Sequence, residues 1–236
     1  MSAVSFEAFG DLAASNLSHT EKAGRYAFQA EAESAVVDDI AAKLWLSPTD
    51  SLLDIGCGTG NLLIPLSCRV RSAAGVDHEK VIGVLQRRHP EIKTYAGNFL
   101  SVSIAGKFDK ILIYSVLHYL TDEFEVCRFL RKALKLLRPS GRLLAGDIPN
   151  ADRKRRFMES DFGRAFNEKW AAQGNGGNEF FKAINADKKM VEFNDEMIKR
   201  TINRLGLGAR DYNIRTQPVN LPFGHTREDI LLVKHR

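Results

Sequence analysis

The sequence predicts an α/β fold with a doubly wound, mainly parallel sheet of seven strands. Short apolar runs alternate with amphipathic helical segments from residue 35 to residue 147, a glycine-rich turn follows the first of these runs, and two further runs stand near the end of the chain. Strand, helix and strand in succession form right-handed crossovers, which give parallel strands with helices on both faces. The two final runs are spaced as an antiparallel C-terminal hairpin, which completes the sheet.

The first five strands and their helices can be assigned in order. Apolar residues at helical spacing from Ala35 to Leu44 predict a helix, and the Ser-Pro-Thr-Asp turn after it leads to the first strand. Apolar runs of the kind found in buried parallel strands place the strands at 51–55, 73–77, 92–95, 108–115 and 142–147. Helical patterns place the intervening helices at 61–66, at 79–88 and around 127–137.

The alternation stops after Pro149. Residues 151–194 are helical in tendency but are interrupted by the glycine- and asparagine-rich run 173–178, so we expect a helical insertion that forms a lid over the substrate site. With a helical lid region at 1–46, the chain is expected to form a single domain over residues 1–236.

The end of the chain is predicted to return to the sheet. A helix at 195–205 stops at Gly206, and the last two strands are expected at 212–220 and 229–233. The turn-forming residues between these strands suit an antiparallel hairpin.

Composition limits the classes of protein that fit. The chain has 236 residues, of which 44% are hydrophobic, a net charge of +5, and three cysteines with no Cys-x-x-Cys pair. An odd number of such cysteines suggests neither a disulfide framework nor a zinc site, and no metal is expected. No apolar stretch approaches the roughly 20 residues that span a bilayer, and the N-terminus lacks a secretion signal, so we expect a cytoplasmic protein without a membrane partner. The basic excess is modest and interspersed with acidic residues, which argues against a nucleic-acid partner.

The glycine-rich turn at 56–60 carries the main functional signal. Such a turn between the first strand and the first helix lets a ligand approach the backbone beyond the carboxyl ends of the strands. Nicotinamide-dependent enzymes use Gly-x-Gly-x-x-Gly to hold a pyrophosphate. Here the glycines are Gly56, Gly58 and Gly60, with Asp54 two positions before the first, and this compressed spacing disfavours a dinucleotide.

The segment Leu53-Asp54-Ile55-Gly56-Cys57-Gly58-Thr59-Gly60, with the elements that follow it to Asp147, resembles the class I S-adenosylmethionine-dependent methyltransferases. In that family the loop wraps the methionine part of the cofactor. The resemblance implies S-adenosyl-L-methionine as cofactor and S-adenosyl-L-homocysteine as product, bound by Asp54, Gly56, Cys57 and Gly58. It covers roughly residues 44–147, extends to the terminal hairpin as topology, and says little about the insertion.

Asp77 is the predicted ribose-binding residue. It ends the second strand about 20 residues beyond the glycine loop, where a carboxylate can accept hydrogen bonds from both ribose hydroxyls. Its alternative role is to form a turn or cap the helix that begins at Glu79, because Asp is a preferred capping residue. We assign the neighbouring His78 to the same cofactor site.

Asn98, in Gly97-Asn98-Phe99, stands where the family commonly has an aspartate that faces the adenine amino group. An amide oxygen can still accept that bond, and Phe99 can pack on the adenine, although an asparagine here also suits a loop. We add Ser115, which follows the fourth strand, to the cofactor contacts. Tyr26 is a further predicted contact, because N-terminal segments of this kind often close over the cofactor in the family.

The reaction asks for few catalytic groups. A methyl sulfonium is already electrophilic, so the protein mainly has to hold a nucleophile in line with it and, where needed, remove a proton. His118, in a Val-Leu-His segment that the family often carries after the fourth strand, is the candidate general base, because its unperturbed pKa lies near neutrality. Packing under the next helix is its alternative role. Tyr119 beside it is a candidate substrate contact.

Positive charge is expected on the acceptor side. Asp147 after the fifth strand leads into the basic run 153–156, and His225 and Arg227 lie in the turn between the last two strands. If those strands run as in the family, both segments face one cleft. We therefore hypothesise an anionic acceptor (a carboxylate, phosphate ester or nucleotide-linked sugar) in contact with Asp147, His225 and Arg227. Solvated arginines on a loop and a helix face are the alternative.

Methyl transfer to a small molecule is the leading hypothesis, with oxygen acceptors favoured because His118 offers a base. An RNA or protein methyltransferase is an alternative, for which the insertion would supply the docking surface. The fourth strand does not end in Asn-Pro-Pro-Tyr or Asp-Pro-Pro-Tyr, the signature of base-amino and glutamine methyltransferases in the family, which lowers the nucleic-acid hypothesis. A cofactor-binding subunit without turnover and an NAD-dependent dehydrogenase are further alternatives, and the sequence names neither the acceptor nor the oligomeric state.

Overall fold

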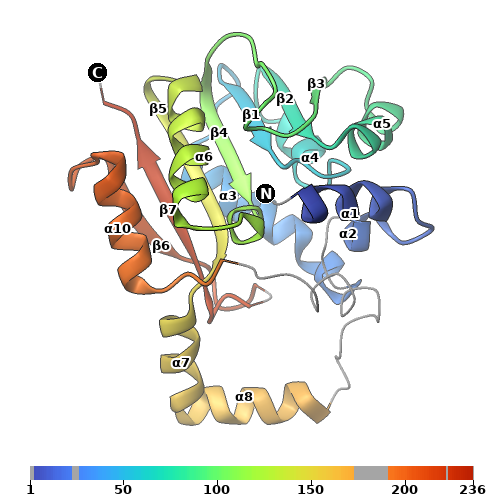
Figure 1. Ribbon diagram of the computed structural model, residues 1–236. Coiled ribbons are helices and arrows are strands. Elements are labelled where there is room, and N and C mark those ends of the chain that lie inside the picture. Colours follow the sequence, from blue (N-terminus) through green and yellow to red (C-terminus); the bar gives the residue numbers. More distant parts are fainter. Residues whose placement is uncertain (1–2, 23–26, 173–190, 222, 236) are drawn as a thin grey trace.

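Seven strands form one mixed sheet in the computed structural model, which describes residues 3–22, 27–172, 191–221 and 223–235. The strand order is β3-β2-β1-β4-β5-β7-β6, in which β7 runs antiparallel to its neighbours β5 and β6 and the other pairs are parallel (Figure 1). The strands are β1 (Ser51–Ile55), β2 (Ser72–Asp77), β3 (Lys93–Ala96), β4 (Phe108–Tyr114), β5 (Leu137–Pro149), β6 (Tyr212–Thr216) and β7 (Arg227–Val233). The predicted mainly parallel seven-stranded sheet with an antiparallel C-terminal hairpin is confirmed.

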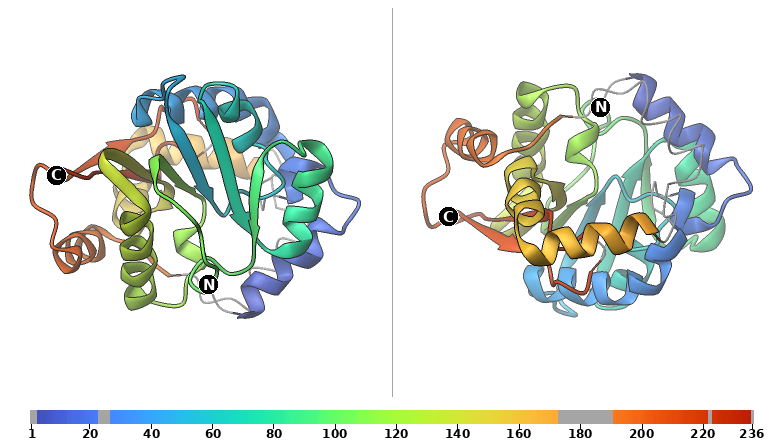
Figure 2. Two further views of the ribbon diagram at one scale, coloured as in Figure 1. Left: turned by 90° about the horizontal axis from the view of Figure 1, so that it is seen from above. Right: turned by 90° about the horizontal axis from the view of Figure 1, so that it is seen from below.

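Helices cover both faces of this sheet (Figure 2). Neighbouring residues of a strand point to opposite faces, and the central strands are apolar on both. Leu52 and Leu144 pack in one core layer with residues of α3, α4 and α5, whereas Leu53 and Leu143 pack in the other with residues of α6 and α10. The bounds are α3 (Glu33–Leu44), α4 (Leu63–Ser67), α5 (Glu79–Arg88), α6 (Glu123–Leu136) and α10 (Asp195–Leu205).

Further helices lie beyond the carboxyl ends of the parallel strands. α1 (Ala3–Ala13) packs on α5 and is followed by α2 (His19–Lys22), while α7 (Ala151–Glu159) and α8 (Asp161–Ala172) continue from β5 and project away from the sheet (Figure 1). The expected insertion is therefore helical in its first part, and the run 173–178 lies outside the described residues. Within the described part of the chain, no helix is both long and apolar enough to cross a membrane.

Two element boundaries differ from the prediction. The fifth strand, expected at 142–147, begins earlier as part of β5, with an irregularity where Ser140 has a φ of 61° and the register with β4 shifts. The strand expected to reach residue 220 ends at Thr216, because Pro218 has no N–H to donate to the sheet. The chain turns back there through a hydrogen bond from Leu221 N to Pro218 O of 3.0 Å.

Asp109 ties together the amino ends of β1 and β4, at the edge opposite the glycine-rich turn. Its Oδ2 accepts hydrogen bonds from the Ser51 N–H (2.8 Å) and the Ser51 hydroxyl (2.7 Å), and Arg138 Nη1 lies 3.2 Å away. Burial by itself would raise the pKa of Asp109, but the bonds from Ser51 and the charge of Arg138 outweigh burial and lower the pKa. The ionised carboxylate therefore stabilises the fold above the pKa of an unfolded aspartate, and this contribution is lost as the pH falls through the folded-state pKa.

Replacing Asp109 with Asn should lower the free energy of unfolding at neutral pH by about 1.5–3 kcal/mol, the range for a lost hydrogen bond to a charged group. The difference from the unmodified chain should shrink in acid, where the native carboxylate is protonated. Urea unfolding at neutral and acid pH measures both effects. An equal difference at all pH values would contradict the ionised role of Asp109.

Candidate cofactor and acceptor site

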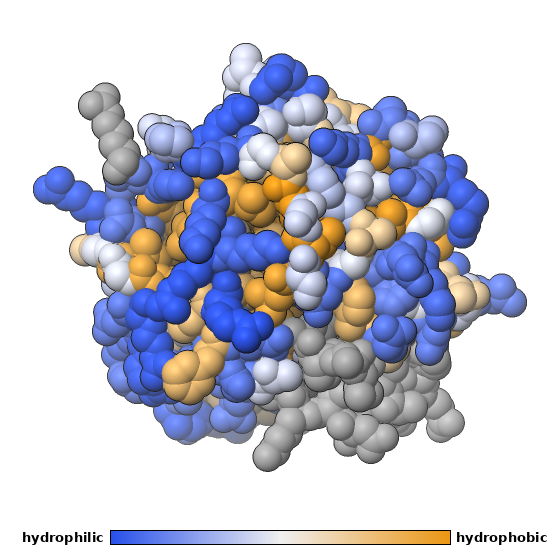
Figure 3. Space-filling model, turned by 45° about the horizontal axis from the view of Figure 1, so that its top comes forward, coloured by the Kyte–Doolittle hydropathy of each residue, from blue (hydrophilic) through white to orange (hydrophobic). Residues whose placement is uncertain are grey.

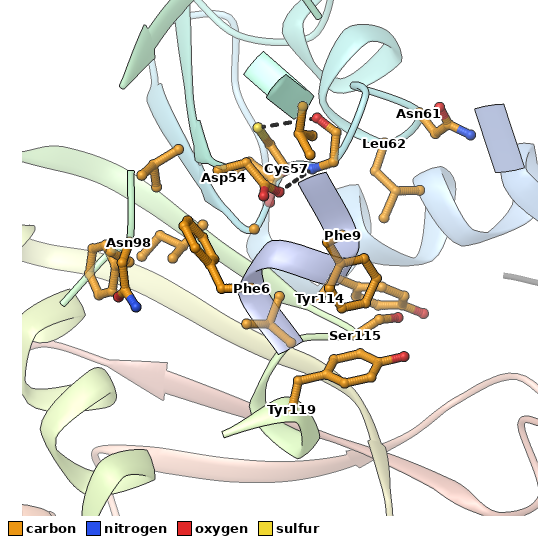
Figure 4. Close-up of a pocket in the computed structure, with 18 of the residues that line it drawn as sticks. Phe6, Phe9, Asp54, Cys57, Asn61, Leu62, Asn98, Tyr114, Ser115 and Tyr119 are labelled. Carbon is orange, nitrogen blue, oxygen red and sulfur yellow. Dashed lines mark hydrogen bonds between the residues drawn. The ribbon is translucent and has the colours of Figure 1, made fainter. Parts of the chain in front are cut away.

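A pocket opens at the carboxyl ends of β1, β2 and β4, beside the glycine-rich turn (Figure 4). Residues predicted to bind the cofactor or substrate gather in its wall: Asp54, Gly56, Cys57, Gly58, Asp77, Asn98, Phe99, Ser115 and Tyr119. Others do not line this pocket, namely His78, His118, Asp147, His225 and Arg227. Tyr26 lies outside the described residues.

Backbone geometry explains why the turn after β1 needs glycine. Gly56 has a φ of 82° and Gly60 a φ of 94°, values that residues with a side chain rarely adopt. A Cβ at Gly56 would lie 2.4 Å from Cγ2 of Val116, and a Cβ at Gly60 would lie 2.5 Å from Cδ1 of Leu85. The turn is therefore pressed between β4 and α5, and a ligand in the pocket meets backbone instead of side chains.

Asp77 is fixed by two backbone N–H groups. The Gly58 N–H donates to Oδ2 over 2.8 Å and the His78 N–H donates to Oδ1 over 2.6 Å. Each carboxylate oxygen keeps a second lone pair, which matches the two hydroxyls of a ribose. Burial raises the pKa of Asp77, and the two N–H bonds offset only part of that rise.

His78 faces helix α1 instead of the pocket. Its Nδ1 accepts the Lys80 N–H over 3.1 Å and so caps α5, which leaves Nε2 to donate to Glu7 Oε2 at 3.3 Å. The ring also lies 4.8 Å from the ring of Phe6, and a Cβ at Gly10 would lie 2.4 Å from it. His78 thus holds α1 beside the pocket and does not line it.

Asn98 and Phe99 form the end of the pocket nearest β3. The Asn98 Oδ1 accepts the Leu100 N–H over 2.9 Å, so the side chain shapes its own loop while its NH₂ group and the second lone pair of the oxygen remain for a ligand. The ring of Phe99 packs 4.6 Å from the ring of Phe129, with Lys132 Nζ 5.0 Å from its centroid. This end suits a flat, apolar ring with a polar edge, such as adenine.

Sequence analysis did not predict that Phe6, Phe9 and Lys22 line the pocket. The two phenyl rings point from α1 into the pocket (Figure 4), and Phe9 meets Tyr119 edge-on at 5.0 Å. The spacing of Phe6, Phe9 and the buried Leu12 marks an apolar helix face, which is the signal that could have indicated them. Lys22 gives no such signal in the sequence, although its ammonium suits the cofactor carboxylate.

Two residues with strained backbones lie next to each other, Ser115 in the pocket wall and Asp147 outside it. Ser115 has a φ of 59° and Asp147 a φ of 57°, and the Ser115 hydroxyl donates to Asp147 Oδ2 over 2.5 Å. Left-handed backbone in residues other than glycine costs free energy and gathers at functional sites. Ser115 follows β4 directly and Asp147 lies near the carboxyl end of β5, so their hydrogen bond links the ends of these two neighbouring strands.

Arg227 and His118 lie behind this strained pair. Arg227 Nε is 3.7 Å from Asp147 Oδ1, and its Nη1 is buried without a hydrogen-bond partner among the described residues. The Nδ1 of His118, which is 6% exposed, is also buried without a partner in that part of the chain. Burial first, and then the charge of Arg227, lowers the pKa of His118 to about 3, although Asp147 acts in the opposite direction.

His225 belongs to an aromatic cluster between the β6–β7 turn and helices α7 and α8. Its ring stacks on Phe157 with centroids 4.6 Å apart and planes 4° apart, and Phe162 and Phe166 lie beside it. Burial and the charge of Arg153 lower the pKa of His225. At this place the basic run of α7 meets the β6–β7 turn.

The other arginines of the α7 run have carboxylate partners. Arg155 Nη2 lies 3.0 Å from Asp152, and Arg156 Nη1 lies 2.8 Å from Asp195. The basic run therefore delivers less free positive charge to the cleft than the sequence suggested. No cluster of side chains suited to a metal ion occurs among the described residues.

Comparison with known proteins finds a methyltransferase domain in the chain. Residues 52–141 match the model of a family described as a methyltransferase domain. The chain is 31% identical over 127 residues to the chondramide synthase of Chondromyces crocatus. This match covers 46% of this chain and 3% of that protein. It is 28% identical over 156 residues to the 27-O-demethylrifamycin SV methyltransferase of Amycolatopsis mediterranei, which covers 61% of this chain and 56% of that protein. The match thus spans a small part of the first relative and about half of the second.

Among solved structures, the N-methyltransferase NodS of Bradyrhizobium japonicum, determined with S-adenosyl-L-homocysteine, matches with a TM-score of 0.63 and 16% identity over 98% of this chain and 99% of that one. At this identity the likeness shows the fold. Residues 52–141 of the chain therefore match a methyltransferase domain within a methyltransferase-like fold, and the residues predicted to bind S-adenosylmethionine gather in the pocket beside its glycine-rich turn.

Replacing Asp77 with Asn should weaken the binding of S-adenosyl-L-homocysteine by about tenfold or more, because an amide has one acceptor oxygen where the carboxylate has two. Affinity of the unmodified chain should fall with decreasing pH as the raised pKa of Asp77 is approached, since protonation removes acceptor capacity. Calorimetric titration at neutral and acid pH measures both effects, with Asp109→Asn as the control that keeps the pocket intact. An affinity that is unchanged by Asp77→Asn would refute the ribose assignment.

Proposed function

We propose that this chain transfers the methyl group of S-adenosylmethionine to an oxygen atom of a small-molecule acceptor that carries an anionic group. The observation that carries this proposal is the buried Nη1 of Arg227, which has no hydrogen-bond partner among the described residues. A buried, unpaired guanidinium N–H costs free energy that a carboxylate or phosphate oxygen recovers. The Oδ1 of Asp147 lies 3.7 Å from Nε of Arg227. Arg227 is therefore only loosely paired and keeps N–H donors for an acceptor.

His118 supports an acceptor with a hydroxyl. Because its pKa is about 3, the ring is neutral at physiological pH, and a neutral imidazole offers one donor and one acceptor. We assign His118 a hydrogen bond to the reacting hydroxyl. A base of such low pKa takes a proton less readily than one with a pKa near the operating pH, so positioning is the larger part of its proposed role.

For this reaction the protein mainly has to position the acceptor oxygen against the methyl group of the cofactor. S-adenosylmethionine, when bound, supplies an electrophilic methyl group, and the acceptor oxygen has to approach it in line with the breaking carbon–sulfur bond. Ser115 and Asp147 stand between the cofactor pocket and Arg227, which is where this approach would take place. The rifamycin relative is named for a methyl group at an oxygen, which agrees with an oxygen acceptor.

Helices α7 and α8, together with α1, are proposed as lids over the two halves of the site. Phe157, Phe162 and Phe166 surround His225 at the acceptor side, and Phe162 is 62% exposed. An apolar acceptor body can pack on these rings while Arg227 binds its anionic group. The rings of Phe6 and Phe9 play the corresponding part over the cofactor.

Charge pairing and free cysteines support two further parts of the proposal. Because Arg155 and Arg156 are paired with carboxylates, α7 offers little charge for a phosphate backbone, which favours a small molecule over RNA.

All three cysteines are free, and Cys68 is exposed, which suits the reducing environment of the cytoplasm.

Incubation with methyl-labelled S-adenosylmethionine and fractionated cell metabolites should transfer label to an acidic small molecule. Retention of the labelled product on an anion exchanger, and stability of the label as an ether or ester methyl group, identify the acceptor class. Label that appears only in RNA or protein would overturn the proposal. Transfer to no fraction, with intact cofactor binding, would indicate a cofactor-binding subunit.

Arg227→Ala should raise the KM for that acceptor by about tenfold or more, as expected for the loss of a charged hydrogen bond, and change the affinity for S-adenosyl-L-homocysteine by less than about twofold. Arg215→Ala, which removes an exposed arginine of the neighbouring strand β6, is the matched control and should leave both values unchanged. If Arg227→Ala weakens cofactor and acceptor binding equally, Arg227 does not bind the acceptor.

A further inference from the structure

A buried carboxylate outside the pocket is connected to one end of it. Asp229 of β7 is fully buried, and three donors converge on its side chain. Its Oδ1 accepts the Asp147 N–H (2.9 Å) and Gln217 Nε2 (3.0 Å), while Oδ2 accepts Lys43 Nζ (2.7 Å). A buried charge persists only where such donors satisfy it, so these four groups hold one another in fixed positions.

The first connection runs through the backbone of Asp147. Asp229 accepts the N–H of this residue at the point where the register between β5 and β7 shifts, between Ala145 and Ile148. The bond therefore supports the left-handed backbone of Asp147, whose carboxylate in turn accepts the Ser115 hydroxyl. Ser115 lines the pocket.

The second connection runs through Gln217, which is 3% exposed. Its NH₂ group donates one hydrogen to Asp229 and the other to the Tyr114 hydroxyl over 3.1 Å. The Tyr114 ring also packs closely on Gly146 of β5, because a Cβ at Gly146 would lie 2.5 Å from its Cδ2. Tyr114 also lines the pocket, so both connections from Asp229 reach the pocket wall.

Lys43 anchors this network to helix α3. Its Nζ lies 2.7 Å from Asp229 and 2.5 Å from Asp39, and its side chain is 11% exposed. The counter-charge to Asp229 thus comes from the helix that covers this face of the sheet, and a single lysine neutralises two carboxylates only in part. The position of Asp229 is therefore set by three elements that are distant in the sequence.

We propose that Asp229 is a positioning residue for the methionine end of the cofactor pocket. Asp77 and Asn98 are assigned to the nucleoside end. Tyr114 and Ser115 lie in another part of the pocket wall, away from Asn98 (Figure 4). Asp229 does not line the pocket and acts through Asp147 and Gln217. The inference rests on the cofactor assignment and is independent of the acceptor.

The test compares two ligands that differ only at the methionine end. S-adenosyl-L-homocysteine carries the amino-acid group, and 5′-methylthioadenosine is a nucleoside thioether without it. In Asp229→Asn the amide offers one acceptor oxygen and two donors to a site that holds three donors, so the contact to Lys43 or the contacts to Asp147 and Gln217 are lost. We expect affinity for S-adenosyl-L-homocysteine to fall about tenfold and affinity for methylthioadenosine to stay within about twofold.

Asp109→Asn is the matched control, because it also removes a carboxylate that accepts a backbone N–H between strands, at the far edge of the sheet. It should lower the melting temperature and leave both affinities unchanged. If Asp229→Asn weakens the binding of both ligands equally, or of neither, Asp229 does not position the methionine end. A purely structural role would not distinguish the two ligands.

Gln217→Met provides a second variant in case Asp229→Asn does not fold. It keeps the side-chain length, leaves Asp229 with Lys43 and the Asp147 N–H, and removes the two bonds that Gln217 donates, to Asp229 and to Tyr114. It should also reduce the ratio of S-adenosyl-L-homocysteine affinity to methylthioadenosine affinity, by a smaller factor than Asp229→Asn. An unchanged ratio would overturn the inference. Failure of the unmodified chain to bind S-adenosyl-L-homocysteine would instead refute the cofactor assignment on which the inference rests.

Discussion

The chain has to turn sharply where three of its parallel strands end, and the site depends on this constraint. It leaves β1 at Gly56, β3 at Gly97 and β4 at Ser115, and all three residues have positive φ; Asp147, near the end of β5, has positive φ as well. Parallel strands end at one edge, so these turns surround a single pocket. Where the turn uses glycine, the ligand meets bare backbone. Ser115 and Asp147 have a strained left-handed backbone but keep polar side chains. These side chains place hydrogen-bonding groups at the end where methyl transfer is proposed to occur.

Much of the fold was predictable because its signals are local. The expected bounds of β1, α5 and α10 agree with the structure, since apolar periodicity, a capping residue and a terminal glycine define them within one segment. The end of β6 was not predicted correctly, although Pro218 was visible, because whether a strand ends depends on the partner strand that needs its N–H groups. The long β5 similarly depends on pairing with both β4 and β7.

The residues predicted to bind the cofactor show the same division between positions set by local spacing and positions set by distant parts of the chain. The glycine turn and Asp77 were predicted because spacing along the chain fixes their place at strand ends. The orientation of His78 was not predicted, because its ring binds Glu7 of α1, a helix some 70 residues away in the sequence. Phe6 and Phe9 were missed for the same reason, as an apolar helix face does not reveal which surface it covers. His118 was visible as a candidate, but only burial beside Arg227 determines its low pKa.

The attachment of α1 bears on how the two halves of the site are coupled. Its ion pairs, from Glu7 to His78 and from Asp11 to Lys80, involve carboxylates that are 66% and 70% exposed, so each contributes little. The helix is held mainly by apolar contacts, those of Phe6 with His78, of Phe9 with Tyr119 and of Ala13 with α5, together with the fully buried Leu12. A bound cofactor would add contacts beneath both rings and hold α1 down. Phe9 touches Tyr119, which adjoins His118, so α1 connects the wall of the cofactor pocket with the side on which the acceptor is proposed to bind.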